Sequence, residues 1–411
     1  MDIIKTSFFS ARVLFLAAAA ALACGPLSAE NPAPAAQGVL QPAERSNAIG
    51  LKFYAGTAAG AGNTVFSPYS LYSAVSMTYD SARDSTEAEM RGVFGFPADR
   101  DALRRETSLL RRGLIRSVKG SEFGRVNAFW FQRGYELLPE YEAVLKSSYS
   151  ASAEYADFRS SAERARTAVN TWARQQTGGR ITGVFEKNSL TQLTQLMLVS
   201  AAYFKGSWKI AFSTDNTSEQ DFTLAGGEKV KAQMMSSAQP VKINYYQDDD
   251  LQAVGLDYLG GGLRMLVLLP GEGHSADETG KDLSPEKLAD IRKGLSGKTV
   301  PVLIFLPRFK ISGSWDLAAG LSALGMPQAF TETADLSGMT GRKGLYLQKA
   351  VQKNYVEVSE EGAALPAAAA PARRGKKPQV FRADRPFLFL IENKRTGLIL
   401  FMGRLDDPLA V

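Results

Sequence analysis

The order of the two kinds of secondary structure along the chain constrains the fold most. Up to about residue 176, apolar side chains recur at helical spacing, and one apolar, aromatic stretch at residues 126–131 favours a strand. After Gly179 the pattern changes to short apolar runs, several of them continuous, which is typical of strands buried on both faces. Helices first and strands later predict an α+β domain with separate helical and sheet layers.

Local signals place the expected elements. Ser67 followed by Pro68 predicts a helix start, because a hydroxyl can cap the helix and proline fits its first turn. The other expected helices are residues 43–57, 84–93, 99–118, 139–147 and 162–176. The later strands are expected at residues 193–204, 241–246, 251–257, 263–269, 300–306, 351–358, 386–391 and 397–405, the last two joined by a hairpin turn at 392–396. Residues 43–411 show no repeat or linker and are expected to form one domain.

The beginning of the chain is expected to be an export segment. Lys5 and Arg12 precede an apolar run at residues 13–23 that is too short to cross a membrane as a mature helix. Two processing sites compete: cleavage after residues 1–29, or lipidation of Cys24, which follows a string similar to a bacterial lipobox. Residues 30–42 would be a Pro/Ala-rich tether. The expected location is therefore the cell surface, as an outer-membrane lipoprotein, or the extracellular space after free secretion.

The inventory of reactive side chains argues against an enzyme. The single histidine, His274, has a glycine-flanked polar context that predicts an exposed loop, so a multi-histidine metal site is excluded. The single cysteine, Cys24, lies in the export segment, which excludes a Cys-His enzyme. No nucleotide-binding signature is present, so neither a cofactor nor a metal is expected. The net charge of +6 is scattered apart from a cluster near Arg373, which favours a solvated basic surface and no nucleic-acid binding.

A run of small residues followed by a basic cluster lies just before the last strands. The stretch VSEEGAALPAAAAPARRGKKPQVF covers residues 358–381, with alanines at 367–370 and basic residues within 373–377. One interpretation is a low-complexity flexible loop. The basic cluster is also a target for a trypsin-like protease, whose specificity pocket has an acidic floor. Both interpretations predict an exposed loop.

A series of sequence strings, in the right order, resembles the serpin family along nearly the whole expected domain. They are NTVFSPYSLYSAVSM, VNAFWFQRGYELLPEY, VNTWARQQTGGRITGVF, LVSAAYFKGSWKIAF, LRMLVLLP, LPRFKISGSWDLAAGLSALGM, VEVSEEG and RPFLFLIENKRTGLILFMGRLDDP. The resemblance implies three β-sheets, about nine helices and an exposed C-terminal reactive loop at about residues 360–381.

The resemblance also implies a function. The expected protein is a monomer that inhibits trypsin-like serine proteases irreversibly and is not itself an enzyme. Its partner protease cleaves the loop and forms a covalent acyl complex. The cut loop then inserts as a new central strand in the largest sheet and traps the protease, so the uncleaved state must be kinetically stable and short of its energy minimum.

Residues at the start of the loop match the hinge about which it would insert. Gly362 is the expected backbone pivot, flanked by Glu360, Glu361, Ala363 and Ala364. Small side chains after the pivot would fit between packed strands without clashes.

The scissile bond is expected within the basic cluster, at one of several positions. Counting forward from the hinge gives Lys376, followed by Lys377. Counting back from the last strands gives Gly375, with Arg374 as the nearest basic alternative. Arg373 and Arg374 would add affinity for proteases that prefer several basic residues.

Other residues match a polar network at the place where the central strands part. Ser67 and Ser70 match its serines, while Ser200 and Gln352 stand where the family usually has asparagine and histidine. Both replacements keep a hydrogen-bonding side chain but change its reach. Ser67 can cap its helix and take part in this network at the same time.

Where the loop would enter the sheet, the family often has a glutamate with a basic partner beside a tryptophan. Glu360, Arg308 and Trp208 match these positions, and an ion pair between Glu360 and Arg308 is expected. Leu365 and Pro366 depart from the run of small residues, and proline cannot donate to a strand ladder. If they slow insertion, the alternative is a serpin-fold protein that acts as a protease substrate or binding module.

Overall fold

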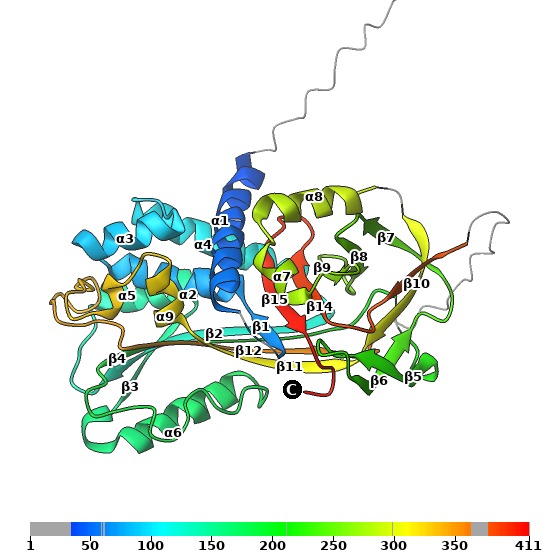
Figure 1. Cartoon of the computed structure of the whole chain (residues 1–411). Helices are drawn as coiled ribbons and strands as arrows, with labels where there is room; N and C mark the ends of the chain where they lie inside the picture. The colour runs from blue at the N-terminus through cyan, green and yellow to red at the C-terminus, as the bar shows by residue number, and fades with distance from the viewer. Residues whose placement is uncertain are drawn as a thin grey trace, which may run out of the picture.

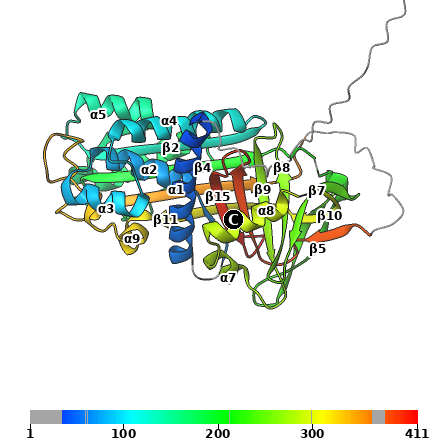
Figure 2. The ribbon, with the colours of Figure 1, turned by 90° about the horizontal axis from the view of Figure 1, so that it is seen from above.

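The computed structural model describes residues 34–58, 60, 62–210, 212–297, 299–362 and 377–410. Most of the helices gather at one end of the molecule, whereas α7 and α8 lie beside the strands of the other end, and a long sheet runs beneath both ends (Figures 1 and 2). The α-helices in these ranges are α1 Pro34–Thr57, α2 Pro68–Ser81, α3 Asp84–Phe94, α4 Arg100–Ser117, α5 Pro139–Val144, α6 Phe158–Gln176, α7 Ala276–Lys281, α8 Pro285–Leu295 and α9 Leu317–Ala323.

The long sheet has five strands in the order β11, β12, β4, β2, β3. Helix α6 covers one face, and α2 lies on the other (Figure 1). Strands β12 and β4 pair in parallel, from Lys349 opposite Met197 to Glu357 opposite Lys205. We call this pairing the seam. The strands are β11 Phe309–Asp316, β12 Lys349–Val358, β4 Leu196–Gly206, β2 Ser121–Gln132 and β3 Ser152–Ala156.

The second sheet is larger and has two parts that meet at β7, which pairs with both β8 and β10. These two parts and the long sheet account for the three expected sheets. The path runs β1, β15, β14, β9, β8, β7, β10, β6, β5, and β13 pairs with β10. Its strands are β1 Thr64–Phe66, β15 Ile399–Leu405, β14 Phe387–Asn393, β9 Leu263–Pro270, β8 Leu251–Asp257, β7 Val241–Gln247, β10 Val300–Pro307, β6 Lys229–Ser236, β5 Thr217–Thr223 and β13 Gln379–Arg382.

Helix α1 begins earlier than its apolar spacing predicts. Residues 30–42 were expected to be a tether, but the helix starts at Pro34 and continues through Pro42. Pro34 lies in the first turn, where proline is tolerated, whereas Pro42 lies inside the helix and cannot donate a backbone hydrogen bond. Val39 and Ala43 are buried in the core, and this packing supports the helix around Pro42. The expectation of a tether is therefore wrong for residues 34–42, while residues 30–33 lie outside the described ranges.

Several elements have no clear signal in the sequence. Strand β5 is mostly exposed and polar, because it lies at the edge of its sheet and buries little more than Phe222. Residues 145–149 form a π-helix where the sequence predicts a continuous helix. The expected loop also ends earlier, since Gln379–Arg382 pairs with β10. The other elements missed by the sequence are β1, β3, β6, β11, β13, α7, α8 and α9.

Candidate functional site

The loop implied by the sequence leaves the sheet at the end of the seam. Strand β12 ends at Val358, and Gly362 forms a parallel bridge with Trp208, just beyond β4. The chain resumes at Lys377, which is exposed, and continues into β13. The residues between these points lie outside the described ranges, and they include Ala363, Ala364, Leu365, Pro366, Arg373, Arg374, Gly375 and Lys376.

The middle of the seam rests on the N-terminus of α2 through buried, uncharged hydrogen bonds. Gln352 accepts from the Ser67 backbone amide at 3.1 Å and donates to the Ser67 carbonyl at 3.1 Å. The Ser67 hydroxyl donates to the Leu400 carbonyl at 2.6 Å and accepts from the Ser70 amide at 3.1 Å. Ser67, Ser70 and Gln352 are each 0% exposed. Ser67 therefore caps α2 and also ties it to β12, which are the two roles expected of it.

Ser200 belongs to the same buried layer, on the opposite side of the seam from Gln352. Asn127, Ser200 and Gln352 occupy one row across β2, β4 and β12. With its amide nitrogen as donor, Asn127 reaches the Ser200 hydroxyl at 2.9 Å. Asn354 donates to Gln352 Oε1 at 3.0 Å, while its own side-chain oxygen Oδ1 has no hydrogen-bond partner among the described residues. We call Ser67, Ser70, Asn127, Ser200, Gln352 and Asn354 the middle network.

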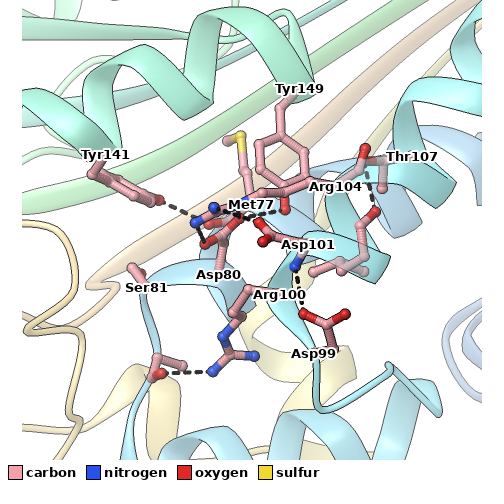
Figure 3. A network of polar contacts seen from close by, with 12 residues as sticks. Met77, Asp80, Ser81, Asp99, Arg100, Asp101, Arg104, Thr107, Tyr141 and Tyr149 are labelled. Atoms are coloured by element: carbon pink, nitrogen blue, oxygen red, sulfur yellow. Dashed lines mark hydrogen bonds and ion pairs between the residues drawn. The ribbon is translucent and has the colours of Figure 1, made fainter.

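The far end of α2 is fixed by a buried carboxylate, Asp80 (Figure 3). Its side chain is 1% exposed and accepts from Arg104 Nε at 2.8 Å, Arg104 Nη2 at 2.7 Å and the Tyr149 hydroxyl at 2.8 Å. Tyr141 donates to the Met77 carbonyl at 2.8 Å. The hydrogen bond to Asp80 raises the pKa of Arg104, and burial raises that of Tyr149. Helices α2 and α4 are thereby joined at the end of α2 that lies opposite Ser67.

Trp208 holds the segment that leads from β12 into the loop. Its indole N–H donates to the Ser359 carbonyl at 2.7 Å, and its backbone N–H donates to the Glu361 carbonyl at 2.8 Å. The ring stacks on Tyr258 with the centroids 4.6 Å apart. The structure thus brings Trp208 to the base of the loop, as the sequence predicts.

Glu360 is nearly buried beside the same segment. It is 8% exposed, and its carboxylate lies 3.7 Å from the Arg308 guanidinium, so the expected ion pair is present. The Thr217 hydroxyl donates to the same carboxylate at 2.9 Å. Thr217 lies in the edge strand β5, which explains why the sequence offered no sign of this contact.

A second ion pair crosses the seam at its end. Lys205 of β4 faces Glu357 of β12 in register, at 3.6 Å, and reaches Glu361 at 2.6 Å. The hydrogen bond to Glu361 raises the pKa of Lys205 despite partial burial, so the lysine is charged at neutral pH. The sequence did not predict this pair, because it depends on the register of two strands that are far apart along the chain. We call Lys205, Glu357, Glu360, Glu361, Arg308, Thr217 and Trp208 the mouth of the seam.

The topology of the seam is suited to accept another strand. A chain that leaves β12 and turns back at Gly362 runs antiparallel to β12, and therefore also to β4, which is parallel to it. It would pair with both strands if they parted.

His274 lies in a loop, 47% exposed and 3.8 Å from Asp250. Among the described residues there is neither a metal-binding cluster nor a helix that could span a membrane.

Comparison with known proteins identifies the family. The model of the serpin (serine protease inhibitor) family matches residues 44–408. A serpin-like protein of Thermococcus kodakarensis is 35% identical over 88% of this chain and 84% of its own. The leukocyte elastase inhibitor of Bos taurus is 34% identical over 85% of this chain and 94% of its own. The chain therefore belongs to the serpin family of serine protease inhibitors.

Solved structures agree on the fold. Uncleaved ovalbumin is 26% identical, with a TM-score of 0.80 over 90% of this chain and 100% of its own. Native protease nexin-1, solved with heparin, is 24% identical, with a TM-score of 0.81 over 90% of this chain and 100% of its own. The α+β serpin fold expected from the sequence is confirmed.

Proposed function

We propose that this protein inhibits trypsin-like serine proteases irreversibly, and that it does so by inserting its cleaved loop into the seam. The observation that carries the proposal is the parallel pairing of β4 with β12 next to a loop that starts at Gly362. Inserted there, the loop would complete two strand ladders, and each added hydrogen bond contributes about 1 kcal/mol net.

The chemistry belongs to the protease. Its serine oxygen attacks the carbonyl carbon of the scissile residue, for which Lys376 is the first choice and Arg374 the second. The peptide bond breaks, the new amine of the following residue takes the proton, and an ester links loop and protease. Insertion of the loop then moves the ester and displaces catalytic groups of the protease, where a misplacement of about 1 Å costs roughly a hundredfold in rate.

Trypsin mixed with the full chain tests the proposal. We expect a complex that survives SDS, together with a C-terminal fragment whose mass shows that it begins at Lys377. Cleavage outside residues 373–377 would exclude both proposed bonds. Cleaved chain without any complex would reject the inhibitory mechanism.

A hinge variant supplies the matched control. Ala363→Arg should abolish the complex but allow cleavage, because a long charged side chain does not fit between packed strands. Ser218→Arg adds the same charge at an exposed position of β5 and should leave the complex intact. Equal complex formation by both variants would contradict insertion.

The second candidate is a serpin-fold substrate or binding module. Leu365 and Pro366 favour it, because proline lacks the donor that a central strand needs. The melting temperature of the cleaved protein separates the two candidates. A sharp rise indicates an inserted loop, whereas an unchanged value indicates a substrate that does not insert.

We also propose that the protein is exported and carries a lipid on Cys24. The apolar run and the lipobox-like string at the start of the chain support this. Labelling with a fatty-acid analogue should mark the wild-type chain and leave Cys24→Ala unlabelled. Export of an unlabelled wild-type chain would favour free secretion after residue 29.

A further inference from the structure

A leucine side chain is exposed at the end of the long sheet opposite the mouth of the seam. Leu193 is 77% exposed, which is the largest exposed fraction among the large apolar side chains that the structure describes. It lies in the turn just before β4, and this end of the sheet is at the left of Figure 1, far from β5. Single exposed leucines are common, so the exposure of Leu193 indicates a site only together with its support and its position.

The turn that carries Leu193 is fixed from both strands of the seam. Leu190 and Thr194, on either side of it, are buried. The side-chain amide of Gln348, which comes just before β12, donates to the Leu193 carbonyl at 2.7 Å and accepts from the Leu196 amide at 3.3 Å. The backbone N–H of Gln348 donates to the Leu196 carbonyl at 3.1 Å. The turn therefore joins the beginnings of β4 and β12 and holds the Leu193 side chain outward.

Strand register indicates which part of the loop would reach this turn after insertion. Gly362 lies opposite Trp208, and an inserted strand is antiparallel to β4. Each residue after Gly362 then lies one position closer to the start of β4. Lys376 follows Gly362 by fourteen residues and comes to the level of Thr194, or a few positions short of it if residues are spent on the turn at Gly362. A protease joined to Lys376 by an ester would therefore lie against the turn that carries Leu193.

We propose that Leu193 is a contact residue for the trapped protease and packs on apolar surface that the protease exposes when insertion distorts it. The proposal rests on the proposed inhibitory function, because the contact forms only after insertion. Distortion of a closely packed enzyme separates side chains that were in contact and exposes some of them to water. Burial of Leu193 against these side chains is favourable. Since the contact is made with the distorted form alone, it favours that form over the active one and slows hydrolysis of the ester.

The sequence around Leu193 also favours an apolar contact over an ionic one. Residues 189–195 are all uncharged. The opposite end of the seam, in contrast, carries the charged groups of the mouth, such as Lys205 and Glu360. Salt screens ion pairs but not apolar contacts, so the contribution of Leu193 should not depend on ionic strength.

Release of active trypsin from the purified complex with the full chain tests the proposal. Leu193→Ser removes the apolar side chain, and we expect trypsin activity to return about tenfold faster than from the wild-type complex, at low and at high salt. Leu409→Ser is the matched control, because Leu409 is also an exposed leucine, 58% exposed, near the end of the chain. Its complex should release trypsin at the wild-type rate. Leu193→Met keeps an apolar side chain and should preserve the slow release.

Measurements on the earlier steps separate this contact from a role in the sheet itself. In Leu193→Ser the rate of complex formation and the melting temperature of the cleaved chain should equal those of the wild type, because the loop inserts equally well. A change in either would show that Leu193 supports the fold or the insertion, and would overturn the proposal. Release from the Leu193→Ser complex at the wild-type rate, or equally fast release from Leu409→Ser, would overturn it as well. A wild-type chain that forms no complex would overturn the inhibitory function, and this contact with it.

Discussion

The mouth and the middle of the seam are held in place by different physics. The mouth uses charged, partly exposed groups, with Arg308 50% exposed. The middle uses uncharged groups that are fully buried, such as Ser67 and Gln352. Exposed ion pairs contribute about 0–1 kcal/mol, whereas a buried polar group left unpaired costs about 1–3 kcal/mol. We therefore expect the middle, where Gln352 ties β12 to Ser67 at the start of α2, to resist separation of β12 from β4 more strongly than the mouth does.

The largest expected effect comes from the support of the middle network. Asp80→Ala leaves Arg104 and Tyr149 without their buried acceptor, so it should destabilise the uncleaved protein by about 3 kcal/mol. Because α2 carries Ser67, spontaneous insertion or polymerisation should also accelerate. Urea unfolding and incubation at raised temperature measure these effects.

Asp101 supplies the control for this prediction. It pairs with the same Arg104 at 3.1 Å, but its side chain is 69% exposed. Asp101→Ala should change stability by less than about 0.5 kcal/mol. Equal losses in the two variants would show that Asp80 is not the anchor of α2.

The next largest effect is expected in the middle itself. Gln352→Leu removes both hydrogen bonds to Ser67 and the acceptor of Asn354, at a cost of about 2–3 kcal/mol in the uncleaved state. Gln175→Leu, on the exposed face of α6, is the control. If the two variants lose inhibitory activity at the same rate on incubation, the barrier to spontaneous loop insertion does not lie in the middle network.

At the mouth, Glu360→Ala should have an intermediate effect. It removes the acceptor of Thr217 and the partner of Arg308, which costs about 1–2 kcal/mol and favours premature insertion or polymerisation. Arg308→Ala should have a smaller effect, because Glu360 then keeps its hydrogen bond with Thr217. Unchanged rates of latency and polymerisation in Glu360→Ala would contradict this role.

The smallest effect is expected for Lys205→Met, about 0.5 kcal/mol and confined to the uncleaved form. The cleaved form should not respond, because the inserted loop separates Lys205 from Glu357. The folded pKa of Lys205 is raised, so its contribution is complete below its ordinary value of 10.5 and is lost as the pH rises through the higher folded value. High salt should lower the stability of the uncleaved wild-type protein as the variant does, because salt screens the ion pair. A loss of stability in the cleaved form of the variant would count against the ion pair.

The sequence predicted the layers of the fold because its apolar periods are long and clear. Residues 251–257 and the start of α3 were placed correctly for that reason. Elements at the sheet edges were not predicted. Strand β5, for example, is stabilised by pairing with β6 and not by an apolar run of its own. The extension of α1 to Pro34 was not predicted, because it depends on the packing of Val39 into the core, which the local sequence does not show.

The same distinction, between local sequence signals and contacts between distant parts of the chain, holds for the site. Family resemblance supplied Ser67, Gln352 and Glu360, whose roles remain predictions while their contacts are now described. It could not supply Lys205 or Asn354, because both depend on strand register. Asn354 shares a face of β12 with Gln352, and this period of two was the one available signal.

The pairing of β13 with β10 determines what a cut molecule becomes. The chain after Lys377 continues into β13 and then into β14 and β15, which are buried along their whole length. A severed C-terminal piece would thus stay embedded as a non-covalent subunit and would not diffuse away. Once such a two-piece molecule is denatured and its pieces separate, the intramolecular route back to the starting conformation is gone.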